Sequence, residues 1–144
     1  MQLAKRIGAT VVATAGGRST AAVRAQRAGQ IIDYIAASLA DALDDKVDVV
    51  INLAAIPPAA AADLVPLVRE GGVIVSIATP IEPPDSARIT AVHFVARNDS
   101  AQLAEIVKLI DSVEITESHR LADLTLVHDR SQAGQTHGKI TVIP

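Results

Sequence analysis

The chain is predicted to be an α/β protein, with a Rossmann-like parallel sheet and helices on both faces. Apolar runs with little polar alternation recur along the sequence, as in strands that are buried on both faces. Stretches with helical spacing separate these runs, and this alternation is typical of a parallel sheet covered by helices. The 144 residues show no repeat and no linker, so one domain, residues 1–144, is expected.

The first elements are predicted from short apolar runs and from glycine. A helix is expected to end just before Gly8, because glycine is common past a helix C-terminus. A buried strand follows at Val11–Ala15, and then a helix at Arg18–Arg27 with two alanines and a valine on its inner face. A short strand is expected at Ile31–Tyr34. A short helix is expected at Ser38–Leu43, where the serine is a suitable N-cap.

The middle of the chain holds the strongest strand pattern. Val47–Leu53 is almost continuously apolar and is predicted as a strand. A helix is predicted from Pro57-Pro58 through Val68, because proline is tolerated in a first turn. Gly71-Gly72 is expected to end this helix. Two further strands are predicted at Val73–Ala78 and Ile89–Ala96, separated by a proline-rich loop.

The last third is predicted to hold two helices and two strands. Ser100 is expected to cap a helix whose apolar residues fall at i, i+3, i+4 and i+7, namely Leu103, Ile106, Val107 and Ile110. Glu114–Arg120 alternates but is polar, so an edge strand is predicted there. A weaker helix is expected at Leu121–Gln132, and Lys139–Ile143 is expected to close the chain as a strand.

Composition excludes several classes of function. Hydrophobic residues make up 49% of the chain, which is incompatible with disorder. With one Tyr, one Phe and no Trp, the core is expected to be aliphatic, and base stacking on an aromatic platform is nearly excluded. The net charge of -3 gives no basic footprint for nucleic acid. The absence of cysteine removes disulfides and thiol nucleophiles. No signal peptide and no long apolar span are seen, so a cytoplasmic protein without membrane partners is expected.

Short motifs along the whole chain occur in the order of a known enzyme family. They are Gln2–Ala9, Ile31–Tyr34, Asp48–Asn52, Gly71–Ile77, Ala101–Ile106, Leu121–Asp123, His128 and Gly138–Val142. Each motif is unspecific alone, but together they resemble the nucleotide-binding domain of medium-chain dehydrogenases/reductases, in the zinc-independent quinone oxidoreductase branch. The resemblance implies a partial dinucleotide-binding domain and an oxidoreductase that transfers hydride from NADPH, its NADP(H) cofactor, to a quinone or enone.

The chain also departs from that family. The family's catalytic N-terminal domain and the first strand with its Gly-rich phosphate loop are absent, so the chain alone is expected to be inactive. The family commonly has an arginine before the final Gly-Lys, and this chain has His137 at that position. The alternative is a non-catalytic fragment or subunit, a binding module completed by another chain. A different Rossmann-like enzyme, such as a methyltransferase, is disfavoured by the order of the motifs.

The resemblance implies a cofactor site at the turn after the second strand of the family's fold. Arg18 lies where this family selects between NADH and NADPH, and no acidic residue occupies Thr14–Ser19, which favours a ribose 2′-phosphate. Thr14, Gly16 and Gly17 belong to the same turn, and the glycines would allow a close approach of the adenosine end. A solvated arginine in an ordinary turn is the alternative. Tyr34 is implied near the adenine or the 2′-phosphate, with a rim tyrosine as its alternative.

A second set of candidates lies at or just after the carboxyl ends of three predicted strands. Open α/β sheets bind ligands at the carboxyl ends of their strands. The residues expected to line the nicotinamide and acceptor cleft are Asn52, Ala54, Ser76, Ile77, Phe94 and Val95. Phe94 is the chain's one phenylalanine, and a core position is favoured slightly over a site position for it.

No catalytic residue and no metal site are predicted. The four histidines lack metal-binding spacing; His128 is expected to pack on its helix, and His119 and His137 are expected at the surface. No proton donor is assigned, and nucleophilic catalysis is not supported.

Assembly is also predicted. In the usual strand order the missing strand lies between those starting near Val11 and Val47, so a partner chain, another segment or closure of the gap is needed. A homodimer through Ile89–Ala96 is expected by resemblance, since this apolar strand has no proline or lysine to blunt its edge.

Overall fold

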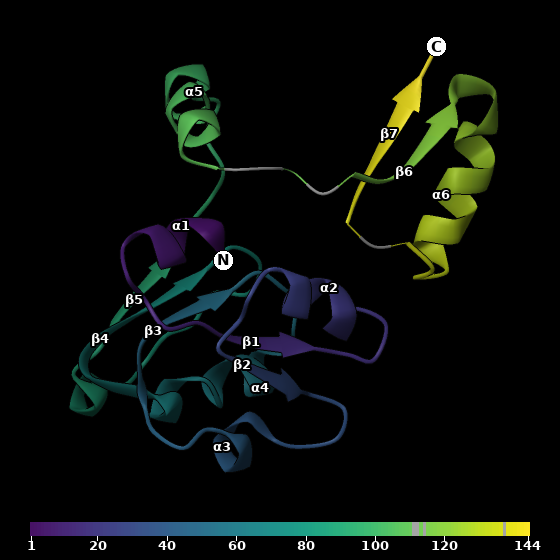
Figure 1. Ribbon diagram of the computed structural model, residues 1–144. Coiled ribbons are helices and arrows are strands. Elements are labelled where there is room, and N and C mark those ends of the chain that lie inside the picture. Colours follow the sequence, from purple (N-terminus) through teal and green to yellow (C-terminus); the bar gives the residue numbers. More distant parts are fainter. Residues whose placement is uncertain (111–112, 114, 137) are drawn as a thin grey trace. The chain divides into compact units, whose positions relative to one another are not determined.

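The computed structural model describes residues 1–110, 113, 115–136 and 138–144. It shows a mixed α/β chain with parallel sheets, which confirms the predicted Rossmann-like fold class (Figure 1). The chain divides into two compact units. Unit 1 comprises Met1–Ile31 and Ser100–Pro144, and unit 2 comprises Ile32–Asp99. No helix in the described ranges is long and apolar enough to cross a membrane.

Unit 2 is organised by a three-stranded parallel sheet. Its strands are β3 (Val47–Asn52), β4 (Val68–Ser76) and β5 (Thr90–His93), in the order β3-β4-β5. The register pairs Asn52 with Ser76 and Ser76 with His93. These three residues are the last of their strands, so the strands end level with one another at one edge, which we call the carboxyl edge.

Short helices and an aliphatic core complete unit 2. The helices are α3 (Leu39–Ala42), α4 (Pro58–Ala62) and the 3₁₀ turns η1 (Val65–Leu67) and η2 (Asp85–Ala87). Ser38 caps α3 as predicted, because its Oγ accepts a hydrogen bond of 3.2 Å from the Asp41 N–H. The buried side chains are those of Ile32, Ala61, Leu64, Leu67, Val68 and Ile74, with Ile74 0% exposed. The expectation of an aliphatic core holds in this unit.

The prediction for the segment around Gly71-Gly72 is wrong. The helix stops at Ala62 and η1 follows, because Pro66 has no N–H for a helical hydrogen bond. β4 begins at Val68 and runs through both glycines, where the register with β3 shifts. Gly71 takes a φ of +80°, and a Cβ on Gly72 would lie 2.6 Å from the Asp48 carbonyl oxygen. The glycines therefore form an irregularity within a strand and do not end a helix.

Unit 1 combines the first elements of the chain with the last. It contains α1 (Gln2–Arg6), β1 (Val12–Ala15), α2 (Thr20–Ala25), α5 (Ser100–Leu109), β6 (Ile115–Arg120), η3 (Leu121–Asp123), α6 (Leu124–Gln132) and β7 (Lys139–Ile143). β2 (Gln30–Asp33) pairs with β1 and crosses the unit boundary. Gly8 follows α1 with a φ of +80°, as expected past a helix end. β6 and β7 form a two-stranded parallel sheet.

Several predicted helices and strands are longer than the observed ones or have displaced ends. β5 covers only Thr90–His93, half of the predicted strand Ile89–Ala96. Tyr34 follows β2, whereas it was expected to be the last residue of that strand. The Arg18–Arg27 helix is confined to α2, since Ser19 occupies its N-cap position. Ser100 is the first helical residue of α5, and Leu121–Gln132 is split between η3 and α6. Glu114, the predicted start of β6, lies outside the described residues.

The sequence predicts that the strands starting near Val11 and Val47, which are β1 and β3, flank the position of a missing central strand. Among the described strands, β1 has only β2 as a hydrogen-bonded neighbour, and β3 has only β4. β6 and β7 pair with each other in a separate sheet. No strand in the described part of the chain is therefore hydrogen-bonded in the predicted slot.

Candidate functional site

A buried polar pair lies at the carboxyl edge of the sheet in unit 2. Asn52 is 8% exposed and Ser76 is 1% exposed, although both side chains are polar. The Asn52 Nδ2 donates to the Ser76 Oγ over 3.0 Å. The sequence placed both residues at strand ends, and the structure brings them together because those ends are in register.

The direction of these hydrogen bonds follows from the single proton of the serine hydroxyl. The Ser76 Oγ donates that proton to the Thr79 carbonyl over 2.6 Å, so it must accept from Asn52. The Asn52 Oδ1 in turn accepts from the Ala54 N–H over 3.2 Å. No buried side-chain nitrogen or oxygen in the described residues lacks a partner. Asparagine suits position 52, because its side-chain amide supplies both the donor and the acceptor that this position requires.

The same network fixes the loops that follow β3 and β4. The Thr79 Oγ1 donates to the Ile56 carbonyl over 2.7 Å, and the Ile77 N–H donates to the Asn52 carbonyl over 3.1 Å. By resemblance, Thr79 belongs to a loop, Ser76–Thr79, that is expected to line the nicotinamide and acceptor cleft, but its hydrogen bonds were not predicted. The sequence gives little indication of the role of Thr79, because a threonine three residues after a strand end is common in loops. The two loops are held against each other by side chains and backbone together.

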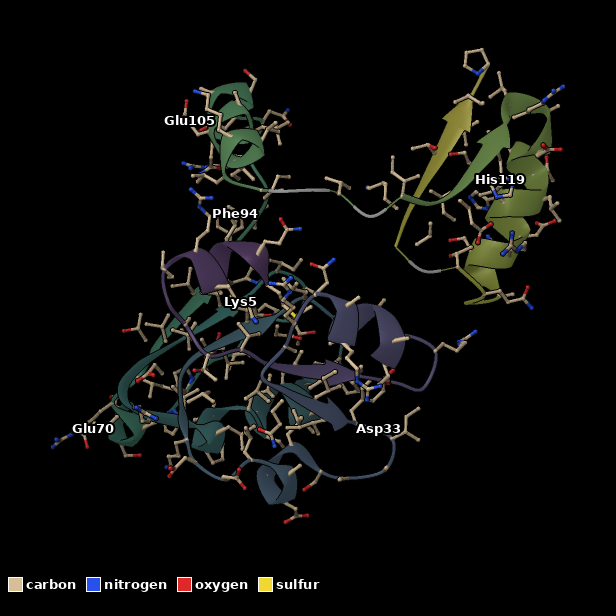
Figure 2. All side chains as sticks on the ribbon, in the orientation of Figure 1. Lys5, Asp33, Glu70, Phe94, Glu105 and His119 are labelled. Carbon is tan, nitrogen blue, oxygen red and sulfur yellow. The ribbon has the colours of Figure 1, made fainter. Side chains whose placement is uncertain are left out.

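The remaining candidates at this edge are exposed. Ala54, Ile77 and Val95 all lie at the surface. Phe94, labelled in Figure 2, is 41% exposed, and its N–H donates to the Ser76 carbonyl over 2.9 Å. The favoured core position for Phe94 is therefore wrong, because β5 ends one residue earlier. Ile77, Phe94 and Val95 give the carboxyl edge an apolar rim beside its buried polar pair.

His93 was given no role from the sequence. It is the last residue of β5 and is exposed, and its Nδ1 lies 3.1 Å from the Ser76 carbonyl oxygen. That carbonyl therefore has two neighbours, the Phe94 N–H and the His93 ring. A lone histidine in a strand carries little signal in a sequence, because only the neighbouring strand supplies its partner.

The glycine turn of unit 1 holds the other group of candidates. The Gly16 carbonyl accepts from the Ser19 Oγ and the Thr20 Oγ1, each over 3.1 Å, so the turn leads directly into α2. Gly16 is buried, whereas Thr14, Gly17 and Arg18 are exposed. A Cβ on Gly17 would meet nothing within 4 Å, so there is open space beside the turn. Arg18 makes no ion pair with any described residue. The exposed Arg18 guanidinium can donate several hydrogen bonds to a phosphate-bearing group.

Tyr34 belongs to unit 2 and directly follows β2. It is 60% exposed. The turn that carries it is held by the Asp33 side chain, whose Oδ1 accepts from the Ile35 N–H over 3.0 Å. This exposure agrees both with a tyrosine that contacts the cofactor and with a surface tyrosine whose hydroxyl is hydrated.

A charged cluster joins β6 to α6 in unit 1. The Arg130 guanidinium donates to both Glu117 carboxylate oxygens, over 2.7 and 3.0 Å, and His119 Nε2 lies 2.8 Å from the same carboxylate. Hydrogen bonds from Arg130 and then His119 lower the pKa of Glu117 to about 2. His119, labelled in Figure 2, is half-buried, so its predicted surface position is wrong. His128 is exposed on α6, and His137 lies outside the described residues.

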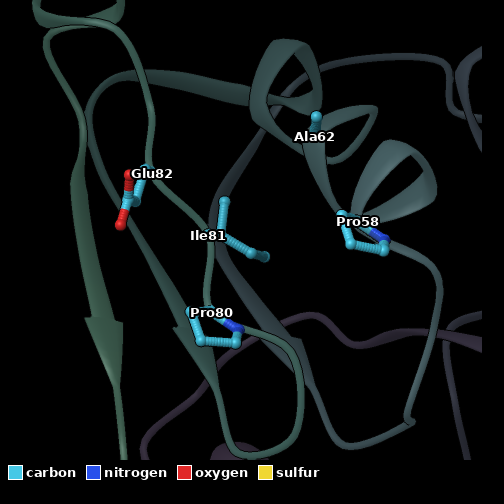
Figure 3. A pocket seen from close by; sticks show the side chains of 5 residues that line it. All are labelled: Pro58, Ala62, Pro80, Ile81 and Glu82. Atoms are coloured by element: carbon cyan, nitrogen blue, oxygen red, sulfur yellow. The ribbon is translucent and has the colours of Figure 1, made fainter.

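Unit 2 also has a small pocket between α4 and the loop after β4 (Figure 3). Its volume is about 240 Å³. The lining residues are Pro58, Ala62, Pro80, Ile81 and Glu82. It is smaller than the roughly 300–1,000 Å³ of typical small-molecule sites and holds one charged group at its rim. The pocket does not include any of the predicted site residues.

Comparisons with known proteins agree with this architecture. A family model described as zinc-binding dehydrogenase matches residues 26–142. The quinone oxidoreductase from Coxiella burnetii is 26% identical, with a TM-score of 0.80, over 98% of this chain and 47% of that one. The Escherichia coli quinone oxidoreductase complexed with NADPH is 18% identical, with a TM-score of 0.78, over 99% of this chain and 52% of that one. The Pseudomonas syringae quinone oxidoreductase is 20% identical, with a TM-score of 0.75, over 99% and 51%.

The chain thus spans about half the length of the structures that it matches. A comparison with curated proteins gave no match.

Proposed function

Because the chain belongs to the zinc-binding dehydrogenase family, we propose that it is the cofactor-binding part of an NADPH-dependent oxidoreductase acting on a quinone or enone. The observation that carries the proposal is the carboxyl edge of the parallel sheet in unit 2. There a buried Asn52–Ser76 pair holds two loops, and the apolar side chains of Ile77, Phe94 and Val95 are exposed at the same edge. Open α/β sheets bind their ligands at this edge. The similarity to quinone oxidoreductases supports the class of acceptor.

The cofactor preference rests on the glycine turn. Arg18 is exposed, and no acidic residue occurs in Thr14–Ser19 that could pair with a ribose 2′-hydroxyl. In the proposal, Arg18 binds the 2′-phosphate, and Thr14, Gly16 and Gly17 let the adenosine end approach the backbone. Tyr34 contacts the adenine or the 2′-phosphate. NADP(H) is therefore the proposed cofactor.

In the proposed mechanism, the cofactor would supply a hydride for the acceptor when bound. The residues of the carboxyl edge orient and shield that reaction. Asn52 and Ser76 keep the loops after β3 and β4 in place, and Ala54 belongs to the first of these loops. Ile77, Phe94 and Val95 provide apolar contacts to the nicotinamide and the acceptor.

Zinc has no place in this proposal. The chain has no cysteine, and the described residues hold no group of three His, Asp or Glu side chains that could bind a metal ion. The residues present do not fit the ion that the family description names.

The catalytic activity is proposed for the complete protein, and the 144 residues alone are expected to bind cofactor with little turnover.

The assembly is proposed to be a homodimer through β5 or a complex with a complementing chain. β5 has only β4 as a neighbour among the described strands, so one side of its backbone is unpaired. The strand carries no proline or lysine, although its four residues make a short edge.

The cofactor proposal is tested by titrating the chain with NADPH and NADH. We expect tighter binding of NADPH. Arg18→Ala should weaken NADPH binding by about 1–3 kcal/mol, roughly 5- to 150-fold, as for a charged hydrogen bond. NADH binding should change little. Arg24→Ala is the matched control, because it removes the same charge from an exposed position on α2. Equal affinities for the two cofactors, or equal losses in both arginine variants, would contradict the proposal.

A further inference from the structure

His93 combines a titratable side chain with a place at the carboxyl edge. It is in register with Ser76, which is in register with Asn52, so the three side chains start from the same level of the sheet. Asn52 and Ser76 are buried and satisfied by each other and by the loops, whereas His93 is exposed. Among these three strand-end residues, His93 is the one with a group open to a ligand.

The Ser76 carbonyl determines which ring nitrogen of His93 carries the proton. The His93 Nδ1 lies 3.1 Å from the Ser76 carbonyl oxygen, which can only accept hydrogen bonds. Nδ1 must therefore carry a hydrogen and donate it. In a neutral ring the other nitrogen, Nε2, is then unprotonated. Nε2 makes no hydrogen bond to any residue in the described ranges, so its lone pair is available at the surface.

The anchor of the ring is itself rigid. The Ser76 carbonyl also accepts from the Phe94 N–H over 2.9 Å, and the Ser76 side chain is tied to Asn52 and to the Thr79 carbonyl. A histidine that is held through one nitrogen presents the other in a defined tautomer and direction. This is the arrangement that general acid–base catalysis requires.

We propose that His93 is the proton-exchanging residue of the acceptor site, with Nε2 in contact with the acceptor oxygen. The inference rests on the proposed function and adds a residue to it. When the acceptor carbon receives a hydride, an electron pair of the carbonyl system moves onto the oxygen. That oxygen takes the proton from Nε2 of the protonated ring, and the ring becomes neutral with Nδ1–H still on Ser76. Solvent returns a proton to Nε2. In the reverse direction, neutral Nε2 takes the hydroxyl proton of the reduced product.

The first test is the tautomer of His93 in the isolated chain. Long-range ¹H–¹⁵N correlation spectra of histidine-labelled protein distinguish a protonated Nδ1 from a protonated Nε2. In the neutral ring of His93 we expect the Nδ1–H form. His128 is the control, because it is exposed on α6 and should show the mixture of tautomers of a free imidazole. A protonated Nε2 in neutral His93 would overturn the proposal.

The second test uses 1,4-hydroquinone as the probe, with and without NADP⁺. We expect the hydroxyl of the probe to shift the Nε2 resonance of His93 in the unmodified chain, a result independent of any variant's folding. His93→Asn keeps an N–H for the Ser76 carbonyl but has no second ring nitrogen. It should weaken probe binding about 3- to 10-fold, the effect of one hydrogen bond, whereas His128→Asn should not.

The outcomes separate this inference from the proposed function. If NADPH binds but the probe neither shifts Nε2 nor distinguishes His93→Asn from His128→Asn, the role of His93 is wrong and the cofactor proposal stands. If the probe binds at Nε2 but neither cofactor binds, the proposed function fails and His93 remains a ligand contact.

Discussion

Removing the Ser76 hydroxyl tests the central feature of the carboxyl edge. The Ser76 Oγ accepts from Asn52 Nδ2 over 3.0 Å and donates to the Thr79 carbonyl over 2.6 Å. Ser76→Ala deletes both bonds and changes little volume. The Asn52 amide then loses its acceptor while it remains buried, and the loop after β4 loses one of its attachments.

The expected loss of stability follows from what becomes unsatisfied. A buried donor without a partner costs about 1–3 kcal/mol. The Thr79 carbonyl belongs to a partly exposed residue and can turn to water, so the Asn52 amide dominates. We therefore expect a loss of about 2 kcal/mol in the free energy of unfolding. Ser86→Ala is the matched control, because Ser86 is exposed in η2 of the same unit and should change stability by less than about 0.5 kcal/mol.

Urea unfolding measured by tyrosine fluorescence is the suitable assay. The chain's one tyrosine, Tyr34, belongs to unit 2 together with Ser76, so its signal reports on the relevant unit. With a slope of about 2 kcal/mol/M, the midpoint of Ser76→Ala should fall by about 1 M at unchanged slope. A midpoint equal to that of Ser86→Ala would refute the argument, because the polar pair would then contribute nothing measurable.

Three further predictions concern other parts of the chain. Gly72→Ala should destabilise unit 2 by about 1–3 kcal/mol in urea unfolding, because its Cβ would lie 2.6 Å from a backbone oxygen; Gly17→Ala, with nothing within 4 Å, should cost far less, and equal costs would contradict the steric argument. The pKa of Glu117 is lowered from 4.5 to about 2, so its stabilising effect on the β6–α6 region is present above pH 4.5 and is lost as the pH falls toward 2. Hydrogen exchange in β6 should show this loss, and Glu117→Gln should abolish that pH dependence; an unchanged dependence would exclude Glu117 as its origin. Val92→Lys should convert the proposed dimer into a monomer near 15 kDa in light scattering, and a monomeric unmodified chain would exclude that dimer.

The sequence alone determined the order and type of most elements. Strands such as β3 and helices such as α3 are specified by patterns within a few residues, including the Ser38 cap that the structure confirms. The same local patterns placed Asn52 and Ser76 at strand ends and carried the resemblance to the family. These features depend on neighbours along the chain, which a sequence displays directly.

Only the tertiary structure decided how those residues are used. Asn52 and Ser76 are 24 positions apart, and their hydrogen bond exists because β3 and β4 pair in one particular register. The tautomer of His93 depends on a carbonyl of the neighbouring strand, 17 positions away. Gly71-Gly72 looked like a helix end but accommodates a shift in register against β3, where a side chain would meet the Asp48 carbonyl. Strand pairing is a non-local choice set by packing and register, so local propensity does not encode it.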